Sequence, residues 1–211
     1  MRAHHQVQVG AEHYGRRYDH KHRWLGYFYQ ISTVLDLAPH AVLEVGPGNG
    51  LVASYLRDNG VQVTTADIDR KLKPTVVASI TDLPFEQGVF DVSMACEVLE
   101  HLPFDEFPQA LRELARVSKK YVLVSLPDAR RTLAHFVVKL PFLPEWKFRG
   151  RLMKGGAHVF DGQHYWEIGK RGFPPSRVRD EIRNAGLTIT KEFAAEDAPF
   201  YHFFLMEKRA A

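Results

Sequence analysis

Residues 42–50, VLEVGPGNG, join a short apolar run to three glycines at alternate positions, and this stretch carries the clearest chemical signal in the chain. Gly46, Gly48 and Gly50 leave the backbone bare, so a ligand can approach it closely and the chain can adopt conformations closed to other residues. A helix that follows such a loop offers its weakly positive N-terminus to the ligand. We expect a ligand site and not a simple turn, because Asp67 follows where an acid would bind a ribose.

The glycine loop is compatible with two classes of ligand. A dinucleotide site requires glycine–x–glycine–x–x–glycine or alanine directly after an apolar strand. Residues 48–53, GNGLVA, match this spacing, but they place Glu44 and Gly46 at strand positions that should be apolar. If the dinucleotide motif is instead taken to start at Gly46, Leu51 stands where the motif requires glycine or alanine. Both registers fail on one count, so an NAD(P)-dependent oxidoreductase is the weaker interpretation.

The pattern from Glu44 to Gly50 resembles the first motif of class I S-adenosylmethionine-dependent methyltransferases of the type 11 group, and further motifs follow in order. Residues 78–103, ASITDLPFEQGVFDVSMACEVLEHLP, are similar to the family's stretch from its third strand through its fourth. Residues 110–127 resemble its next helix and fifth strand. The resemblance implies S-adenosyl-L-methionine as cofactor and S-adenosyl-L-homocysteine as product. It also implies methyl transfer to an oxygen or nitrogen atom of a small-molecule, glycan-linked or lipid-linked acceptor.

The resemblance assigns the cofactor to residues at the ends of the predicted strands. The glycine loop would contact the methionine part, Asp67 would bind the ribose and Ile68 would pack on the adenine. Ser79 stands where many family members carry the aspartate that receives the adenine amino group. The implied cofactor-binding residues are Glu44, Gly46, Gly48, Gly50, Asp67, Ile68, Ser79, Ile80, Cys96 and Glu97. A non-catalytic protein that binds this cofactor remains an alternative, because binding motifs alone do not demonstrate turnover.

Methyl transfer from a sulfonium is an in-line displacement, in which the protein mainly aligns the acceptor and excludes water. A base is needed if the acceptor is a hydroxyl or a protonated amine, and histidine suits this role near neutral pH. His101, one helical turn beyond Glu97, is the candidate base, and both are candidate catalytic residues. The alternative, a structural histidine at the edge of a helix, is slightly favoured for His101. His158, Asp161 and His164 are spaced as metal ligands could be, but no supporting pattern accompanies them, so we expect no metal site.

The composition favours a cytoplasmic protein. A chain of 211 residues, 45% of them hydrophobic, can bury a sizeable core. Its single cysteine excludes an internal disulfide and fits a reducing compartment. The polar N-terminus lacks the apolar segment of a signal peptide, and no stretch reaches the roughly 18 apolar residues of a membrane span. The sequence leaves the oligomeric state open.

The predicted elements alternate as a parallel sheet with helices on both faces requires. Helices are expected over residues 16–38, 49–60, 105–118 and 176–186, and strands over 41–45, 61–67, 75–79, 89–96, 121–127, 187–193 and 200–208. This order predicts an α/β, Rossmann-like methyltransferase fold, whose mostly parallel seven-stranded sheet ends in a C-terminal antiparallel hairpin. Ligands of such sheets bind at the carboxyl ends of the strands, where the glycine loop and Asp67 are expected.

We expect a single methyltransferase domain over residues 1–211. Its parts would be an N-terminal helical cap (1–38), a cofactor-binding core (40–127), a lid or acceptor insertion (128–172) and a closing helix with strands (173–211). Residues 128–172 are too long for an ordinary connection. The acceptor-side candidates are His164, Tyr165 and Trp166 from this insertion and Tyr18 from the cap.

The positive charge of the chain is concentrated after residue 127. Residues 128–186 hold 12 lysines and arginines against 6 acids. Such a surface is either simply solvated or attracts an anionic acceptor, an acidic lipid headgroup or nucleic acid. The sequence carries no nucleic-acid recognition motif, so we expect a small-molecule acceptor, which the basic segment allows to be anionic.

Overall fold

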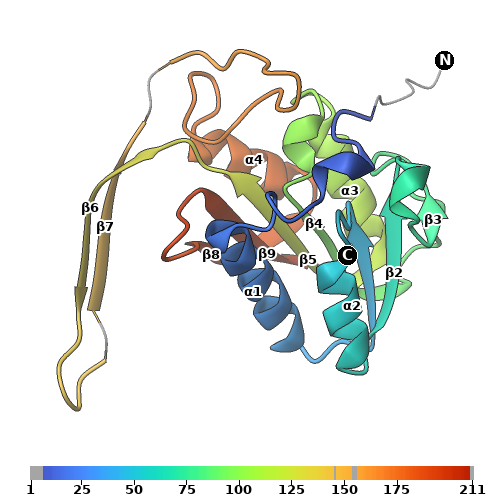
Figure 1. The fold of residues 1–211 in the computed structure, drawn as a ribbon, viewed down its shortest axis with the longest axis horizontal. Coiled ribbons are helices and arrows are strands. Elements are labelled where there is room, and N and C mark those ends of the chain that lie inside the picture. The colour runs from blue at the N-terminus through green and yellow to red at the C-terminus, as the bar shows by residue number, and fades with distance from the viewer. Residues whose placement is uncertain (1–6, 145, 154–155, 210–211) are drawn as a thin grey trace.

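The computed structural model describes residues 7–144, 146–153 and 156–209. Its main sheet has seven strands in the order β3-β2-β1-β4-β5-β9-β8 (Figure 1). These strands are β1 (Ala41–Val45), β2 (Gln62–Asp67), β3 (Val76–Val77), β4 (Phe90–Cys96), β5 (Ser118–Pro127), β8 (Leu187–Ala194) and β9 (Tyr201–Lys208). Strands β1 to β5 run parallel to one another, whereas β9 is antiparallel to both β5 and β8. The mostly parallel sheet with a closing antiparallel hairpin is confirmed.

In the described part of the chain, four α-helices cover the two faces of the sheet (Figure 1). They are α1 (Lys21–Leu35), α2 (Leu51–Asp58), α3 (Phe107–Val117) and α4 (Pro175–Asn184). Leu123 of β5 packs into the core under α1 and α2, whereas Val122 and Val124 pack into the core under α3 and α4. This division follows from the alternation of side chains along a strand. No helix in the described part of the chain is long and apolar enough to cross a bilayer.

Trp24, Phe28, Ile31 and Leu35 are spaced in the sequence as one face of a helix, but of these four only Ile31 and Leu35 pack against the core in helix α1. Trp24 and Phe28 are 53% and 59% exposed, whereas Tyr27 and Val34 are buried. The helix also begins at Lys21 and not at residue 16. Large apolar residues line more than one side of this helix, so their spacing indicates the helical period without fixing the buried side. The predicted cap before residue 7 lies outside the described residues.

The segment after β5, predicted as one lid, consists of two different parts. Strands β6 (Arg131–Val138) and β7 (Trp146–Leu152) form an antiparallel hairpin, here called the arm, that projects from the body (Figure 1). Residues 156–172 return to the body of the protein. Of the described residues in 128–172, only Tyr165 lines the main cavity described below. The arm therefore does not cover this cavity.

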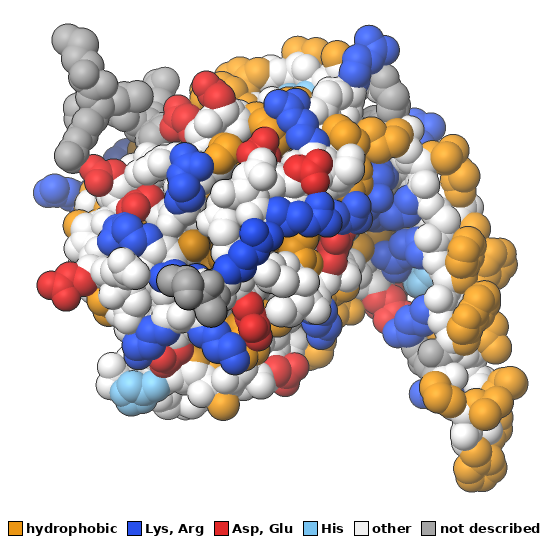
Figure 2. All heavy atoms as spheres, turned by 180° about the vertical axis from the view of Figure 1, so that it is seen from behind, with side chains coloured by type: hydrophobic (Ala, Val, Ile, Leu, Met, Phe, Trp, Pro, Cys, Tyr) orange, Lys and Arg blue, Asp and Glu red, His pale blue; other side chains and the backbone are white. Residues whose placement is uncertain are grey.

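Apolar side chains of the arm face solvent. Figure 2 shows them along its outer length, with lysine and arginine side chains between the arm and the body. The large apolar residues of the arm that are exposed include Leu133, Phe136, Phe142, Leu143, Trp146 and Phe148. The arm is fastened to the loop before β9, where Lys147 pairs with the Glu196 carboxylate at 2.5 Å and Arg149 donates to the Ala195 carbonyl oxygen at 3.2 Å.

A buried ion network fastens the base of the arm to the sheet. The carboxylate of Asp128, at the end of β5, is fully buried and accepts hydrogen bonds from Arg130, Arg151 and His202. The second ring nitrogen of His202 lies 2.9 Å from the carboxylate of Glu192 in β8. Charges and hydrogen bonds thus link the arm to β5, β8 and β9.

Candidate active site

The glycine loop lies at the carboxyl end of β1, and its shape requires glycine. Gly46, Gly48 and Gly50 have φ values of +74°, +54° and +75°. A Cβ on Gly46 would lie 2.4 Å from Cγ2 of Val98, and one on Gly48 would lie 2.9 Å from Cε1 of Tyr14. A side chain at Gly50 would meet no atom within 4 Å, so only the backbone conformation demands glycine there.

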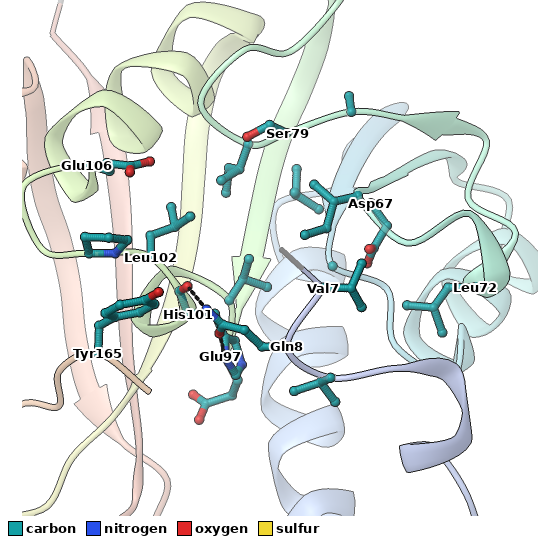
Figure 3. A pocket seen from close by; sticks show the side chains of 18 of the residues that line it. Val7, Gln8, Asp67, Leu72, Ser79, Glu97, His101, Leu102, Glu106 and Tyr165 are labelled. Carbon is teal, nitrogen blue, oxygen red and sulfur yellow. Dashed lines mark hydrogen bonds between the residues drawn. The ribbon is translucent and has the colours of Figure 1, made fainter. Parts of the chain in front are cut away.

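A main cavity of about 360 Å³ opens beside this loop (Figure 3). In Figure 3, Asp67 and Ser79 lie on one side, and Leu102, Glu106 and Tyr165 lie on the other. Its lining residues include Gly46, Asp67, Ile68, Ser79, Ile80, Glu97, His101, Leu102, Glu106, Tyr165 and the N-terminal residues Val7, Gln8 and Val9. The cavity therefore joins the residues predicted to bind adenosine with part of the predicted acceptor side.

A second, smaller cavity of about 40 Å³ lies on the other side of the glycine loop. Its lining includes Glu44, Gly46, Gly48, Cys96, Glu97, Tyr14, Tyr18 and Arg23. The two cavities share Tyr14, Gly46 and Glu97. Tyr18, predicted on the acceptor side, lines the smaller cavity instead, because the chain before α1 lies over the glycine loop.

The end of β2 directs Asp67 into the main cavity. One oxygen of its carboxylate accepts a 2.7 Å hydrogen bond from the backbone nitrogen of Asp69, which orients the group. Burial raises the pKa of the Asp67 carboxyl. Ile68 is 36% exposed in the cavity wall, whereas Ile80 is buried behind it. The Ser79 hydroxyl lies 2.9 Å from that of Thr81, so it is turned toward its own loop.

In the described part of the chain, two buried polar atoms of residues that line the smaller cavity have no hydrogen-bond partner, namely Nε of Arg23 and Oε2 of Glu44. The Arg23 guanidinium lies 4.3 Å from the ring centroid of Tyr18. Burial raises the pKa of Glu44 to about 8, so this side chain is protonated at neutral pH and can donate a hydrogen bond. A cation and a neutral acid beside bare backbone fit the amino-acid end of S-adenosylmethionine. Burial also raises the pKa of the Cys96 thiol, which keeps it from acting as a thiolate.

Glu97 borders both cavities at the point where β4 ends. Its φ of +56° is left-handed, and the resulting bend turns the side chain away from the strand into the site. The hydroxyl of Ser125 donates a 2.8 Å hydrogen bond to its carboxylate. Burial raises the pKa of Glu97 to about 7, although the Arg23 charge and the Ser125 hydrogen bond lower it. A carboxyl group with this pKa can exchange a proton at neutral pH.

His101 also lines the main cavity, but its ring is partly committed. Nδ1 lies 3.0 Å from the carbonyl oxygen of Gln163 and 3.2 Å from Oε1 of Gln8. Burial lowers the pKa of His101 to about 4. The ring is therefore neutral at pH 7, with its proton on Nδ1 facing the carbonyl oxygen, and it is a weaker base than Glu97.

The loop that contains the other acceptor-side candidates runs along the 3₁₀ helix η3 (Leu99–His101). The backbone nitrogen of Tyr165 donates to the Glu100 carbonyl oxygen at 2.8 Å, and its ring lines the main cavity. Trp166 is fully buried, and its Nε1 donates to the Leu102 carbonyl oxygen at 3.2 Å. The expectation that Trp166 faces an acceptor is wrong, because the side chain fills the core and anchors the loop.

His164 meets a different set of residues from the one that its sequence spacing suggested. Ligand-type atoms of Glu100, His101 and His164 lie within 4.8 Å of one another. Asp161 instead accepts hydrogen bonds from the backbone nitrogens of Gln163 and His164, both at 2.9 Å, and so shapes the turn. No metal ligands were expected from the sequence, and no local spacing reveals this cluster because His164 is far along the chain from the adjacent Glu100 and His101.

Three further residues of the site escaped sequence reasoning, namely Gln8, Arg23 and Ser125. The side-chain amide of Gln8 donates a 3.0 Å hydrogen bond to the carbonyl oxygen of His101, which lies 93 residues further along the chain. Arg23 belongs to a helix whose register the sequence did not fix. Ser125 could have been found, because it is a hydroxyl residue near the end of a predicted strand that pairs with β4.

Comparison with known proteins agrees with this geometry. Residues 43–124 match the family model of the methyltransferase domain. Over 174 residues the chain is 30% identical to the ubiquinone biosynthesis O-methyltransferase of Xanthomonas euvesicatoria pv. vesicatoria (strain 85-10), and the match covers 75% of this chain and 67% of that protein. The chain belongs to the class I S-adenosylmethionine-dependent methyltransferases, and S-adenosylmethionine is its cofactor.

Solved structures share the fold. One is the 1,6-didemethyltoxoflavin-N1-methyltransferase of Burkholderia thailandensis with bound S-adenosylhomocysteine, with a TM-score of 0.61, 14% identity and coverage of 91% of this chain and 80% of that one. Another is the magnesium protoporphyrin IX methyltransferase of Synechocystis PCC 6803 with its bound cofactor, with a TM-score of 0.58, 17% identity and coverage of 90% and 83%. At these identities the likeness concerns the fold alone.

Proposed function

We propose that the protein transfers the methyl group of S-adenosylmethionine to a hydroxyl oxygen of a small acceptor bound in the main cavity. The position of Glu97 carries this proposal, because its carboxylate borders both the smaller cavity and the main cavity. Similarity to proteins named O-methyltransferases supports oxygen as the methylated atom. The described residues that line the main cavity include no lysine or arginine, which favours an uncharged acceptor over the anionic one that the sequence allowed.

The residues of the two cavities divide the binding of the cofactor between them. Asp67 would hold the ribose hydroxyls, Ile68 would contact the adenine, and Arg23 would pair with the carboxylate of the methionine part. The carboxyl group of Glu44, which burial keeps protonated, would donate a hydrogen bond to the same end. The sulfonium then falls near Glu97, between the two cavities.

When bound, the cofactor supplies an electrophilic methyl group on a positively charged sulfur. The acceptor oxygen attacks this carbon and forms the new C–O bond, while the bond to sulfur breaks and its electron pair stays on the sulfur. The proton of the acceptor hydroxyl passes to the Glu97 carboxylate. Gln8, Leu102 and Tyr165 would hold the acceptor and exclude water, so that the oxygen, the methyl carbon and the sulfur lie in line.

Calorimetric titration of the full chain tests the cofactor assignment. S-adenosylmethionine and S-adenosylhomocysteine should bind, NADH should not, and Asp67→Ala should weaken binding of both nucleosides. Turnover is then followed with radiolabelled S-adenosylmethionine and a panel of phenols paired with the matching anilines. Label in the phenol products supports the proposal. Label only in the anilines, or cofactor binding without turnover on any pair, would contradict it and favour an N-methyltransferase or a non-catalytic binder.

A further inference from the structure

Three side chains beside the main cavity form a set that suits a metal ion. Glu100 and His101 belong to η3, and His164 lies on the loop whose Tyr165 backbone nitrogen donates to the Glu100 carbonyl oxygen. One ligand-type atom of each lies within 4.8 Å of the others. Bonds of about 2.0–2.2 Å from nitrogen or carboxylate oxygen to a zinc-like ion would place ligand atoms about 3.3–4.4 Å apart. Only a small approach of the side chains is therefore needed.

Glu100 gives the second, independent observation. Its side chain is fully buried, and neither carboxylate oxygen has a hydrogen-bond partner among the residues that the structure describes. A buried carboxyl group without partners costs stability, and native structures normally satisfy such groups. The nearby rings of His101 and His164 donate no hydrogen bond to the Glu100 carboxyl group. A cation held between the three side chains would satisfy both the charge and the unused oxygen atoms.

The histidines are already oriented as metal ligands usually are. Nδ1 of His101 lies 3.0 Å from the Gln163 carbonyl oxygen, and Nδ1 of His164 lies 3.0 Å from the carboxylate of Glu167. Both contacts place the ring proton on Nδ1 and leave the lone pair of Nε2 for another partner. A histidine whose other nitrogen donates to a carboxylate or a carbonyl oxygen is the common arrangement around protein metals.

We propose that Glu100, His101 and His164 bind one divalent transition-metal ion at the edge of the main cavity. Two imidazoles and one carboxylate suit Zn²⁺, Fe²⁺, Mn²⁺ or Co²⁺ better than Mg²⁺, which prefers oxygen ligands. Three protein ligands leave positions open, and His101 lines the cavity, so an open position can face the acceptor. There the ion would bind the acceptor oxygen and make its proton easier to remove. This role rests on the proposed methyl transfer, whereas the binding of the ion does not.

The experiment measures metal binding without cofactor or acceptor. The full chain, stripped with a chelator and dialysed, is titrated with Zn²⁺ by calorimetry and with Co²⁺ by visible absorption, which reports nitrogen and oxygen ligation. We expect one tight site per chain. Glu100→Gln and His164→Gln should each lower the affinity more than tenfold, and Glu167→Gln, which alters the hydrogen bond to His164 and the ion pair with Lys170, should lower it about tenfold. His40→Ala, at an exposed histidine far along the chain from the cluster, should change nothing.

Equal affinity and stoichiometry in the wild type, Glu100→Gln and His164→Gln would overturn the proposal. So would the absence of tight uptake by the stripped wild type. Titration with S-adenosylhomocysteine shows whether each variant is folded, and His164→Gln keeps the test open if Glu100→Gln does not fold. Failure of metal binding leaves the methyl-transfer proposal standing. Tight metal binding without turnover on any phenol or aniline would instead count against methyl transfer alone.

Discussion

The hydroxyl of Ser125 donates a 2.8 Å hydrogen bond to the carboxylate of Glu97. Ser125 lies opposite Cys96 in the parallel pairing of β5 with β4, so the register of the sheet places the hydroxyl beside the residue that follows the strand. This hydrogen bond favours the charged carboxylate and opposes the effect of burial, which raises the pKa of Glu97 to about 7. A core strand thereby tunes the group that we propose as the base.

Ser125→Ala should move the acid limb of the pH–rate profile to higher pH. Loss of a hydrogen bond to a charged group is worth about 1.5 kcal/mol or more, or about one pH unit. Activity at pH 6 should fall about tenfold and activity at pH 9 should hardly change, because the base must be deprotonated to act. Ser125→Ala leaves in place the charged or titratable groups near Glu97, namely Arg23, Glu100, His164, Glu167, Tyr18, Tyr201 and Cys96. Ser125→Thr retains a hydroxyl and serves as the control; identical profiles for wild type and Ser125→Ala would contradict the role.

Arg23 and Asp67 should affect different parts of the cofactor. Arg23→Ala should weaken S-adenosylhomocysteine binding by tenfold or more, because the charge that faces its carboxylate is lost. The same variant should bind 5′-methylthioadenosine, which lacks the amino-acid part, as the wild type does. Asp67→Ala should weaken both ligands, since both carry the ribose. Calorimetry on the two variants with the two nucleosides measures this, and equal losses for Arg23→Ala would show that the assignment to the smaller cavity is mistaken.

The three loop glycines should differ in their tolerance of alanine. Left-handed backbone costs an alanine about 1–2 kcal/mol at each position. Gly50→Ala should cost about that much and leave nucleoside binding intact, because its Cβ meets open space. Gly46→Ala should cost more and impair binding, because its Cβ would displace Val98 and with it the segment that holds Glu97. Denaturant unfolding and S-adenosylhomocysteine titration check this order, and equal effects at the two positions would refute it.

The ion network at the base of the arm should make stability depend on acid. Burial would raise the pKa of the Glu192 carboxyl, but hydrogen bonds from His202 and Arg179 lower it to about 2, and the pKa of Asp128 is likewise held well below its usual range by His202 and Arg130. Carboxyl groups with lowered pKa values stabilise the folded state fully at pH values above the usual glutamate pKa of about 4.3. This stabilisation is lost as the pH falls toward about 2 and the groups become protonated.

The matching experiment compares melting temperatures between pH 7 and pH 2. Asp128→Asn should lower the melting temperature at pH 7 and flatten its decline in acid. Asp180→Asn, which breaks an exposed ion pair with Arg183, should leave the curve of the wild type nearly unchanged. A decline in Asp128→Asn as steep as in the wild type would mean that other carboxylates govern acid stability.

The cofactor half of the molecule could be predicted from the sequence because its signals are local. The glycine loop, Asp67 and the segment around Glu97 each follow a strand, and parallel strands bring their carboxyl ends to one edge. The acceptor half could not be predicted in the same way. His101 meets Gln163 and Gln8 through contacts 62 and 93 residues apart in sequence, which no short motif records.

Two segments misled the sequence analysis for a physical reason. Trp166 stands among charged and aromatic residues, a composition shared by pockets and by cores; here Phe104 and Phe107 surround it, with ring centroids 4.8 and 5.0 Å away. The arm showed no strand pattern because apolar side chains face solvent along its length. Alternation arises when one face of a strand is buried, and this hairpin has no core beneath it.

The left-handed backbone at Glu97 means that the fold gives up stability at this position. Such a conformation costs a non-glycine residue on the order of 1–3 kcal/mol, and a buried carboxyl group adds a desolvation cost. Glu97→Gly relieves both and should raise the melting temperature while abolishing turnover, a trade between stability and activity found where selection has acted on chemistry. Glu97 is the one residue of 94–102 with a positive φ, so in this range a glycine should raise the melting temperature above that of the matching alanine variant only at Glu97.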